Sequence, residues 1–495
     1  MTALVLALGC FDLTTRSLWG DEGASIVIAS QHGAAFWHAV ARDGGNMLLY
    51  YLVLHAVVSA FGTGLVAVRL PSVIAAAACV PAIFLLARRL LEPRAAMMAA
   101  AVGSASLFLV YWGQMARGYT LVALLATVST LAFVVACETG RPRSFVAYGV
   151  VTVLMCYTLL LAVLVVAAHL ASLALRRGPL RVRALLVTFG AVALSCTPLV
   201  VLAVSRGTGQ LFWLGPPTGY DVRVVTAFLA SAPGNYGKAV AGELLVAASV
   251  VLVAGAAVLL VLDVARRGRG REQWAQLLLL GWLALPMAIA YLVSRAFQPV
   301  MVDRYFAFSV PATALVLGGL LGRIRAAPLA WSACAGLVAL RLVQVPPQYV
   351  QPIDDYAGAT AYVLSSSRPG DCVAFYSNDG RVEFRYYLEH RSAAERSADG
   401  PAPRPVLPAA PWSADPAVVE QYSSLSPSQL RAVESSCPRV WLVASHVGHP
   451  WGTAGSRAND ARFEGLRGAL AAAYPASATR DFASVSVTSF AAAAA

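Results

Sequence analysis

Long apolar runs alternate with short polar loops over the first two thirds of the chain. A helix that crosses a bilayer needs about 20 apolar residues, and eight runs approach that length: 70–87, 95–112, 119–137, 184–204, 244–262, 274–293, 305–321 and 328–345. A further run, 145–175, is too long for one helix, and we interpret it as two short helices hinged near 156–158.

Arginines cluster in five loops between these runs, and they indicate orientation because short cytoplasmic loops collect arginine and lysine. The loops lie at 88–94, 141–143, 176–183, 266–271 and 323–325. All five fall on one side only if 145–175 crosses twice and 48–61 lies on the outer surface as an interfacial helix. The pattern predicts about eleven spans, with the N-terminus inside and the C-terminus outside. The first run, 1–13, is too short to span, and we expect translation to start upstream.

Composition also favours a membrane protein. Of 495 residues, 58% are hydrophobic and only 13% are charged, and the mean hydropathy is +0.67, whereas soluble domains carry about a quarter charged residues. Lys238 is the only lysine, so the net charge of +12 is almost entirely arginine. Because these arginines occupy short loops and form no basic stripe, we expect membrane lipids as partners and no nucleic acid.

The chain becomes more polar from about Pro346. Strand-like segments at 371–377, 439–447 and 484–490 alternate with helical segments at 354–366, 381–390 and 461–474. This pattern predicts a small extracytoplasmic α/β domain over 346–495, with a partly parallel sheet, after a transmembrane domain over 1–345. Cys372 and Cys437 each precede a strand, so they form either a disulfide or two unpaired buried thiols. The other six cysteines lie in apolar segments and are expected in the core.

Polar residues on the predicted outer face are candidates for chemistry. Asp21 and Glu22 follow the first apolar run. Asp21 could act as a general base for a hydroxyl, with Glu22 orienting it or holding a cation, or the pair could simply start a helix. Arg117 lies in a short turn between two runs, and Arg304 lies at the head of another. They could bind a phosphate, whose oxygens match a guanidinium, or only reach lipid headgroups.

Five segments in this order carry a family resemblance: SLWGDEGAS, YYLVLHAVVSAFG, VRLPSVIAAAACVPAIFLLARRL, YWGQMARGYTL and DRYFAFSVPATALVL. Over about 18–321 the chain resembles the GT-C glycosyltransferases of the protein O-mannosyltransferase and aminoarabinose-transferase branch, which is glycosyltransferase family 39-like. The resemblance implies a polytopic α-helical enzyme that takes a sugar from a polyprenyl-phosphate carrier on the outer face. The outer first loop and interfacial helices would occupy about 14–66.

The resemblance also implies roles for individual residues. Asp21 corresponds to the family's base, Glu22 to its second acid, and Arg117 to the arginine that contacts the donor phosphate. Arg304 occupies the family's Arg-Tyr position, and with Gln114 we assign it to the donor phosphate. The resemblance further suggests substrate contacts at Asn46, Tyr50, Tyr51 and His55.

Three positions depart from the family pattern. Asn46-Met47-Leu48-Leu49 stands where members commonly have His- or Lys-Pro-Pro. Met115 replaces an acid in the turn before Arg117, and Leu159 replaces a histidine. These changes affect donor and acceptor recognition, so they leave the sugar and the acceptor open.

The expected reaction is a single inverting displacement that requires no cofactor. A divalent cation could bind Asp21 and Glu22, although two adjacent carboxylates make a weak site. The resemblance favours mannose or a pentose such as arabinose as the sugar, and a protein, lipoglycan or cell-wall polysaccharide as the acceptor. The exported region either binds the acceptor, with His446 and His449 contributing, or only caps the cleft. The alternatives are a polyprenyl-linked lipid transporter or flippase, and a non-catalytic membrane scaffold.

Overall fold

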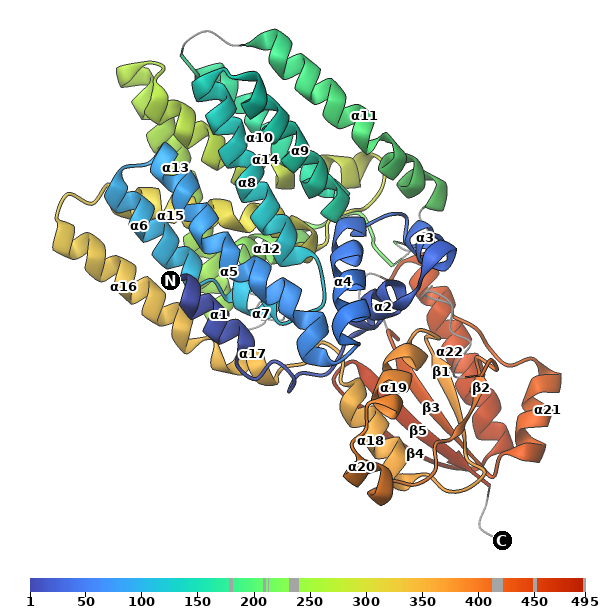
Figure 1. The fold of residues 1–495 in the computed structure, drawn as a ribbon. Helices are drawn as coiled ribbons and strands as arrows, with labels where there is room; N and C mark the ends of the chain where they lie inside the picture. The colour runs from blue at the N-terminus through green and yellow to red at the C-terminus, as the bar shows by residue number, and fades with distance from the viewer. Residues whose placement is uncertain are drawn as a thin grey trace.

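A helical part and a smaller part that contains a β-sheet make up the protein (Figure 1). The computed structural model describes residues 1–177, 181–207, 211, 213–230, 240–411, 422–447 and 452–492. His449 therefore lies outside the described residues. The helical part comprises α1 (Thr2–Cys10), α2 (Gly20–Ser30), α3 (Gly33–Arg42), α4 (Leu48–Phe61), α5 (Leu65–Leu90), α6 (Pro93–Ser104), α7 (Leu107–Gly113), α8 (Tyr119–Thr139), α9 (Pro142–Thr158), η1 (Leu160–Val163), α10 (Leu164–Ser172), η2 (Leu173–Leu175), α11 (Val182–Arg206), α12 (Gly219–Leu229), α13 (Val240–Arg267), α14 (Arg271–Ala296), η5 (Asp303–Ser309), α15 (Val310–Gly322) and α16 (Ala327–Val343).

The predicted apolar runs all fall on helices. Within the described residues, six helices are long and apolar enough to cross a membrane, or seven if the pair α6–α7, which bends by 42°, counts as one span. The predicted break in 145–175 is present, because α9 ends at Thr158 and a series of shorter helices continues to Leu175. The count of eleven stays a prediction, since α1 and α9 have only 9 and 17 residues.

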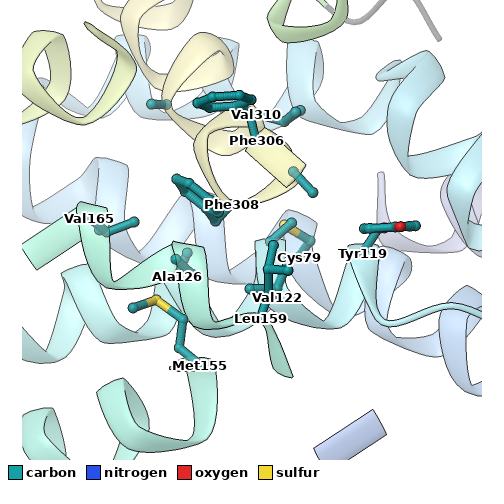
Figure 2. Packing of buried hydrophobic residues seen from close by; sticks show 14 of the residues in the cluster. Cys79, Tyr119, Val122, Ala126, Met155, Leu159, Val165, Phe306, Phe308 and Val310 are labelled. Atoms are coloured by element: carbon teal, nitrogen blue, oxygen red, sulfur yellow. The ribbon is translucent and has the colours of Figure 1, made fainter. Parts of the chain in front are cut away.

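Small residues and a buried aromatic cluster hold the helical part together. Gly318 and Gly322 of α15 pack so closely on α6 that an added Cβ would lie 2.5 Å from the Cβ atoms of Ala99 and Ala95. Such small-residue contacts are typical of helices packed in membranes. Figure 2 shows a second contact, in which Phe306 and Phe308 of η5 lie among buried residues of α5, α8, α9, α10 and α15. This packing fixes η5, the segment that contains Arg304.

The C-terminal part consists of α17 (Pro346–Val350), α18 (Tyr356–Ser366), β1 (Cys372–Tyr376), α19 (Gly380–Glu389), α20 (Ala393–Ala398), β2 (Arg404–Leu407), α21 (Pro427–Ser436), β3 (Arg439–Ser445), α22 (Ala454–Ala473), β4 (Ala476–Phe482) and β5 (Val485–Ala491). The strands form a mixed sheet in the order β2-β1-β3-β5-β4, with β1 parallel to β2 and β3 and the remaining pairs antiparallel. The expected partly parallel sheet is therefore present, while the domain boundary after 345 stays a prediction.

Both faces of the central strands are buried. Val373 and Phe375 of β1 pack with α18 and α19 on one face, and Ala374 of β1 packs with α21 and α22 on the other. Alternate side chains of a strand point to opposite faces, so an almost continuous apolar run such as Cys372–Tyr376 requires cover on both sides. The helices on the two faces provide that cover.

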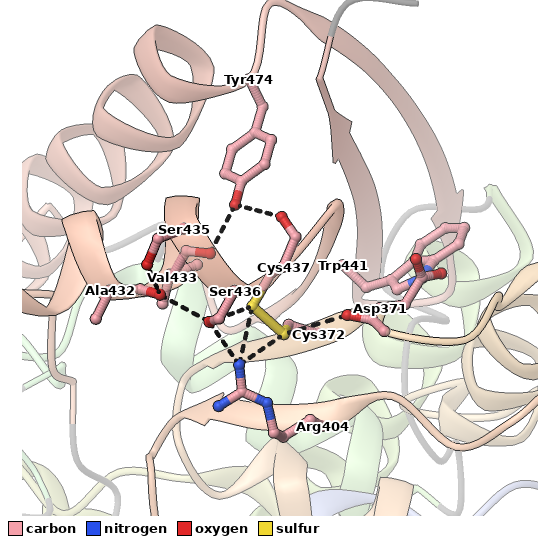
Figure 3. Close-up of a disulfide and its surroundings, with 11 residues drawn as sticks. Asp371, Cys372, Arg404, Ala432, Val433, Ser435, Ser436, Cys437, Trp441 and Tyr474 are labelled. Atoms are coloured by element: carbon pink, nitrogen blue, oxygen red, sulfur yellow. Dashed lines mark hydrogen bonds between the residues drawn. A yellow bond between two sulfur atoms is a disulfide. The ribbon is translucent and has the colours of Figure 1, made fainter.

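A disulfide joins Cys372 at the start of β1 to Cys437 just before the neighbouring strand β3 (Figure 3). The two Cα atoms lie 5.7 Å apart, and 65 residues separate the cysteines along the chain. Of the six free cysteines, five are buried, but Cys10 is exposed. The expectation of a core position for Cys10 was wrong because α1 buries only Val5 and Gly9.

We expect Cys372→Ser to lower the free energy of unfolding of the C-terminal part by about 2–4 kcal/mol, because the disulfide closes a long loop in the unfolded chain. Urea unfolding of the full chain, followed by protease susceptibility of this part, measures the change. Cys10→Ser is the matched control, since its thiol is free and exposed. Equal unfolding midpoints for the two variants would contradict the prediction.

Candidate active site

Helix α2 places two adjacent acids in different surroundings. It begins at Gly20, so Asp21 and Glu22 lie in its first turn, where the helix dipole favours negative charge. Successive residues of a helix point about 100° apart. Glu22 is fully buried, whereas 34% of the Asp21 side chain is exposed. Only Asp21 can therefore meet a molecule from outside the protein.

Glu22 forms a buried, two-pronged ion pair with Arg69 of α5. Arg69 Nε donates to Glu22 Oε1 and Arg69 Nη2 donates to Glu22 Oε2, both at 2.9 Å. The Ala116 backbone N–H also donates to Glu22 Oε1, at 2.8 Å. Arg69 Nη1 in turn donates to the carbonyl oxygens of Leu13 and Arg16. Glu22 thus ties α2, α5, the first loop and the turn before Arg117 into one rigid unit.

Gln114 lies outside the candidate site. Its side-chain amide donates to the carbonyl oxygens of Gly9 and Phe11, and its Oε1 accepts from Arg16 Nη2 at 2.9 Å. The side chain is buried against the end of α1 and does not line the cavity beside Asp21. Gln114 therefore anchors α1 and its following loop, and we assign it no contact with the donor phosphate.

Asp21, Arg117 and Arg304 converge although nearly 300 residues separate the first from the last. Asp21 Oδ2 lies 3.4 Å from Arg117 Nη2 and 3.8 Å from Arg304 Nε. Burial alone would raise the pKa of Asp21, but the charges of Arg117, Arg304 and His446 outweigh it and hold the pKa below its usual value. Asp21 is consequently an ionised carboxylate at neutral pH.

Several buried N–H groups at this site have no hydrogen-bond partner among the described residues. They are Arg117 Nε, Arg304 Nε and Trp19 Nε1, and all three side chains line the same cavity. Buried donors in proteins are almost always satisfied. These three atoms are shielded from the cavity, but the two guanidinium groups line it, and such a pair of cations fits an oxyanion ligand such as a phosphate.

Tyrosines and a further acid hold Arg117 in place. Arg117 Nη1 donates to Ser25 Oγ and to the Tyr51 hydroxyl, and Tyr51 donates to Asp43 Oδ2 at 2.8 Å. Ser72 Oγ donates to the Arg117 carbonyl oxygen and hydrogen-bonds the Tyr50 hydroxyl. Tyr50 and Tyr51 therefore lie behind the arginine, where they position it.

The two other predicted substrate contacts differ in location. Asn46 lines the cavity, as does Asp43, which pairs with Arg206 Nη1 at 3.3 Å. His55 does not line it, because its Nδ1 lies 2.7 Å from the Ala29 carbonyl oxygen and its ring packs on Phe36. Sequence reasoning missed Asp43, which resembles a turn residue before Gly44-Gly45 and meets its arginine only in the fold.

The cavity beside Asp21 has a volume of about 590 Å³ and is completed by the C-terminal part. Asp354, Asp379 and His446 line it together with Asp21, and the Gly20 N–H donates to Asp354 Oδ2 at 3.2 Å. Burial raises the pKa values of Asp354 and Asp379. Among the described residues, no group of three or more His, Cys, Asp or Glu side chains could hold a metal ion.

These C-terminal residues had a signal in the sequence. Asp379 follows β1 closely and His446 directly follows β3. Because β1 and β3 are parallel, their carboxyl ends meet at one edge of the sheet, and ligands of α/β folds bind at such edges. The strands were predicted and His446 was already a candidate for acceptor binding, so Asp379 could have been proposed as its neighbour.

One family model and several solved structures match this chain. Residues 46–202 match the family model described as dolichyl-phosphate-mannose-protein mannosyltransferase. The crystal structure of ArnT from Cupriavidus metallidurans bound to undecaprenyl phosphate is 12% identical and aligns over 98% of this chain and 96% of that one, with a TM-score of 0.54. An Archaeoglobus fulgidus oligosaccharyltransferase tethered with an acceptor peptide is 12% identical over 89% of this chain and 68% of its own, with a TM-score of 0.46. No match was found among curated proteins.

The chain shares the fold of ArnT, and the resemblance to the protein O-mannosyltransferase and aminoarabinose-transferase branch drawn from the sequence motifs is confirmed. The family match contains Arg69 and Arg117, while Asp21 and Arg304 lie outside its limits.

We expect Glu22→Gln to lower the stability of the whole helical part by about 3–5 kcal/mol, because the Arg69 charge would stay buried without its partner. The melting temperature and the monodisperse fraction of the purified protein measure the effect. Glu389→Gln is the matched control, since Glu389 makes an exposed ion pair with Arg385. If Glu22→Gln and this control had the same melting temperature, the buried ion pair would be dispensable for stability.

Proposed function

We propose that this protein is a membrane glycosyltransferase that transfers a sugar from a polyprenyl-phosphate carrier to an acceptor hydroxyl on the extracytoplasmic side. The observation that carries the proposal is the Asp21 carboxylate, held between Arg117 and Arg304 on the wall of a cavity of about 590 Å³. The shared fold of ArnT, whose structure contains undecaprenyl phosphate, supports a lipid-linked donor.

The arginines form the donor half of the site. Arg117 and Arg304 bind the phosphate of the carrier through the guanidinium groups with which they line the cavity. As the bond between the sugar and the phosphate breaks, negative charge grows on the departing phosphate. Two fixed cations in a partly buried cavity stabilise that charge more than water would.

Asp21 acts on the acceptor. The acceptor hydroxyl oxygen attacks the anomeric carbon from the side opposite the phosphate, and its proton passes to the Asp21 carboxylate. The new carbon–oxygen bond forms while the bond to phosphate breaks, and the electron pair of the broken bond leaves with the phosphate. A single displacement of this kind inverts the anomeric configuration. The reaction requires no redox cofactor.

Binding of the sugar donor changes the pKa of Asp21. Arg117 and Arg304 hold the pKa of Asp21 low while they pair with it. When the donor phosphate engages the same two cations, their pull on Asp21 weakens and its basicity increases. The carboxylate therefore becomes a better proton acceptor when a donor is bound.

The sugar and acceptor are proposed more broadly. Mannose is favoured by the description of the matching family, with a pentose such as arabinose as the second choice. The acceptor is a protein, a lipoglycan or a cell-wall polysaccharide. Residues 1–345 form the membrane domain in this proposal, and 346–495 form an extracytoplasmic domain that contributes the acceptor side of the cavity through Asp354, Asp379 and His446.

We expect Asp21→Asn to lower turnover at least about 100-fold, the scale of losing a general base. Purified protein is incubated with a panel of polyprenyl-phosphate sugars and an acceptor extract, and release of free polyprenyl phosphate is measured. NMR of the product gives its anomeric configuration.

The matched control for this experiment is Asp12→Asn, since Asp12 is exposed, has a positive φ that asparagine tolerates, and lies outside the cavity. Wild-type turnover in Asp21→Asn would remove Asp21 from the mechanism. Failure of the wild-type protein to release polyprenyl phosphate from every donor would favour a transporter or a scaffold instead.

The pH dependence tests the pairing of Asp21 with the arginines. A base with a lowered pKa is active above that pKa and loses activity as the pH falls through it, so the acid limb of kcat/KM lies below the usual carboxyl range. Arg304→Gln removes one of the cations that lower the pKa, and we expect the acid limb to move to higher pH while KM for the donor rises. A pH–rate profile measures both. If the acid limb of the Arg304→Gln profile did not move, a group other than Asp21 would be responsible for it.

A further inference from the structure

A second cavity lies at the arginine-rich end of the helical part. It has a volume of about 570 Å³ and is walled by the C-terminal end of α5, the start of α6, and α13, α14 and α15. Arg88 on its rim follows Arg69 by 19 positions of α5, which corresponds to roughly 28 Å along a helix. This cavity is therefore distinct from the one beside Asp21.

The walls of this second cavity are amphiphilic. Its floor is apolar and includes Leu279, Leu315, Val316 and Leu320. Its rim carries four arginines and two glutamates: Arg88, Arg89, Arg271, Arg323, Glu92 and Glu272. The volume falls within the roughly 300–1,000 Å³ of typical small-molecule sites. An apolar floor with a basic rim fits a ligand that has a hydrocarbon tail and an anionic head.

The four rim arginines are paired unequally with acids. Arg89 and Arg271 share one acid, Glu138, at 2.9 and 2.7 Å. Among the described residues Arg88 makes no ion pair, and its guanidinium carbon lies 5.8 Å from the centroid of the Phe84 ring. Arg323 is held by Asp263 at 3.1 Å and by Glu272 at 3.2 Å. Arg88 is therefore the rim cation that is available to a phosphate.

We propose that this cavity binds one anionic glycerophospholipid of the leaflet at the arginine-rich end, with its phosphate at Arg88, on the rim that also carries Arg323, and an acyl chain over Leu315 and Val316. Three of its walls, α5, α14 and α15, belong to candidate membrane spans, so the ligand arrives from the bilayer. Basic pockets between membrane helices select anionic lipid headgroups in this way. The phosphate of the reacting carrier is bound at the opposite end, so the two sites do not compete.

Two kinds of variant separate charge from volume. Arg88→Gln removes a rim cation and leaves no described acid unpaired. Arg323→Gln removes the partner of the partly exposed Asp263 and leaves Glu272 with Arg267. Gly319 lines the cavity, and an added Cβ there meets Leu91 Cδ2 at 3.5 Å, an ordinary contact. A larger side chain in Gly319→Leu therefore extends into the cavity without disturbing the helix. Arg143→Gln is the matched control, because Arg143 is exposed at the same end but outside the cavity.

Native mass spectrometry of the full chain with equal amounts of phosphatidylglycerol and phosphatidylcholine tests the proposal. We expect wild type and Arg143→Gln to retain one phosphatidylglycerol at least about tenfold over phosphatidylcholine. Retention should fall about fivefold for each rim arginine replaced, and should be lost in Gly319→Leu. Size-exclusion chromatography checks that each variant is folded.

Three results would overturn the assignment. Equal retention of the two lipids would show that the rim charge selects nothing. Unchanged retention in Gly319→Leu would place the lipid elsewhere on the protein. Displacement of phosphatidylglycerol by glycerol phosphate at similar concentration would mean that the cavity binds a soluble anion. None of these results depends on glycosyl transfer, so the lipid site can fail while the proposed enzyme activity stands.

Discussion

The buried ion pair between Glu22 and Arg69 is the interaction on which the arrangement of the site depends. Both side chains are 1% exposed, and two hydrogen bonds of 2.9 Å join them. Burying two charges is costly unless their geometry is good and their other polar atoms are satisfied. Arg69 meets that condition through backbone carbonyls of the first loop, and Glu22 meets it through the Ala116 N–H. The pair thereby fixes α2 relative to the turn that carries Arg117.

A fixed α2 explains how neighbouring acids acquire opposite roles. Glu22 points inward and pairs with Arg69. Asp21, one position earlier in the helix, therefore points into the cavity. There its pKa is held low by Arg117 and Arg304, while burial raises the pKa values of Asp354 and Asp379 across the same space. Carboxyl groups whose pKa values are driven apart by their surroundings are characteristic of sites that move protons.

The sequence predicted the elements that depend on short-range patterns. It did not predict the side-chain positions that depend on contacts between distant residues. Apolar runs located the long helices and the break near Thr158, and strand-like segments located β1, β3 and β5. The family motifs indicated Asp21, Arg117 and Arg304 as candidate site residues. Gln114 belongs to the same motif as Arg117, yet the turn between them directs it to the carbonyl groups of α1. No local pattern reveals that direction.

The C-terminal part is a structural component of the site as well as a cover. The Leu18 N–H donates to the Tyr387 hydroxyl at 2.7 Å, and the Ala357 N–H donates to Ser17 Oγ at 3.0 Å. Glycine at position 23 allows α2 to approach α19 so closely that a Cβ there would overlap Glu383 Oε1. These contacts hold the segment before Asp21 from both sides. Because Asp354, Asp379 and His446 complete the cavity that Asp21 faces, the helical part alone has Arg117 and Arg304 but lacks the wall that these three residues form.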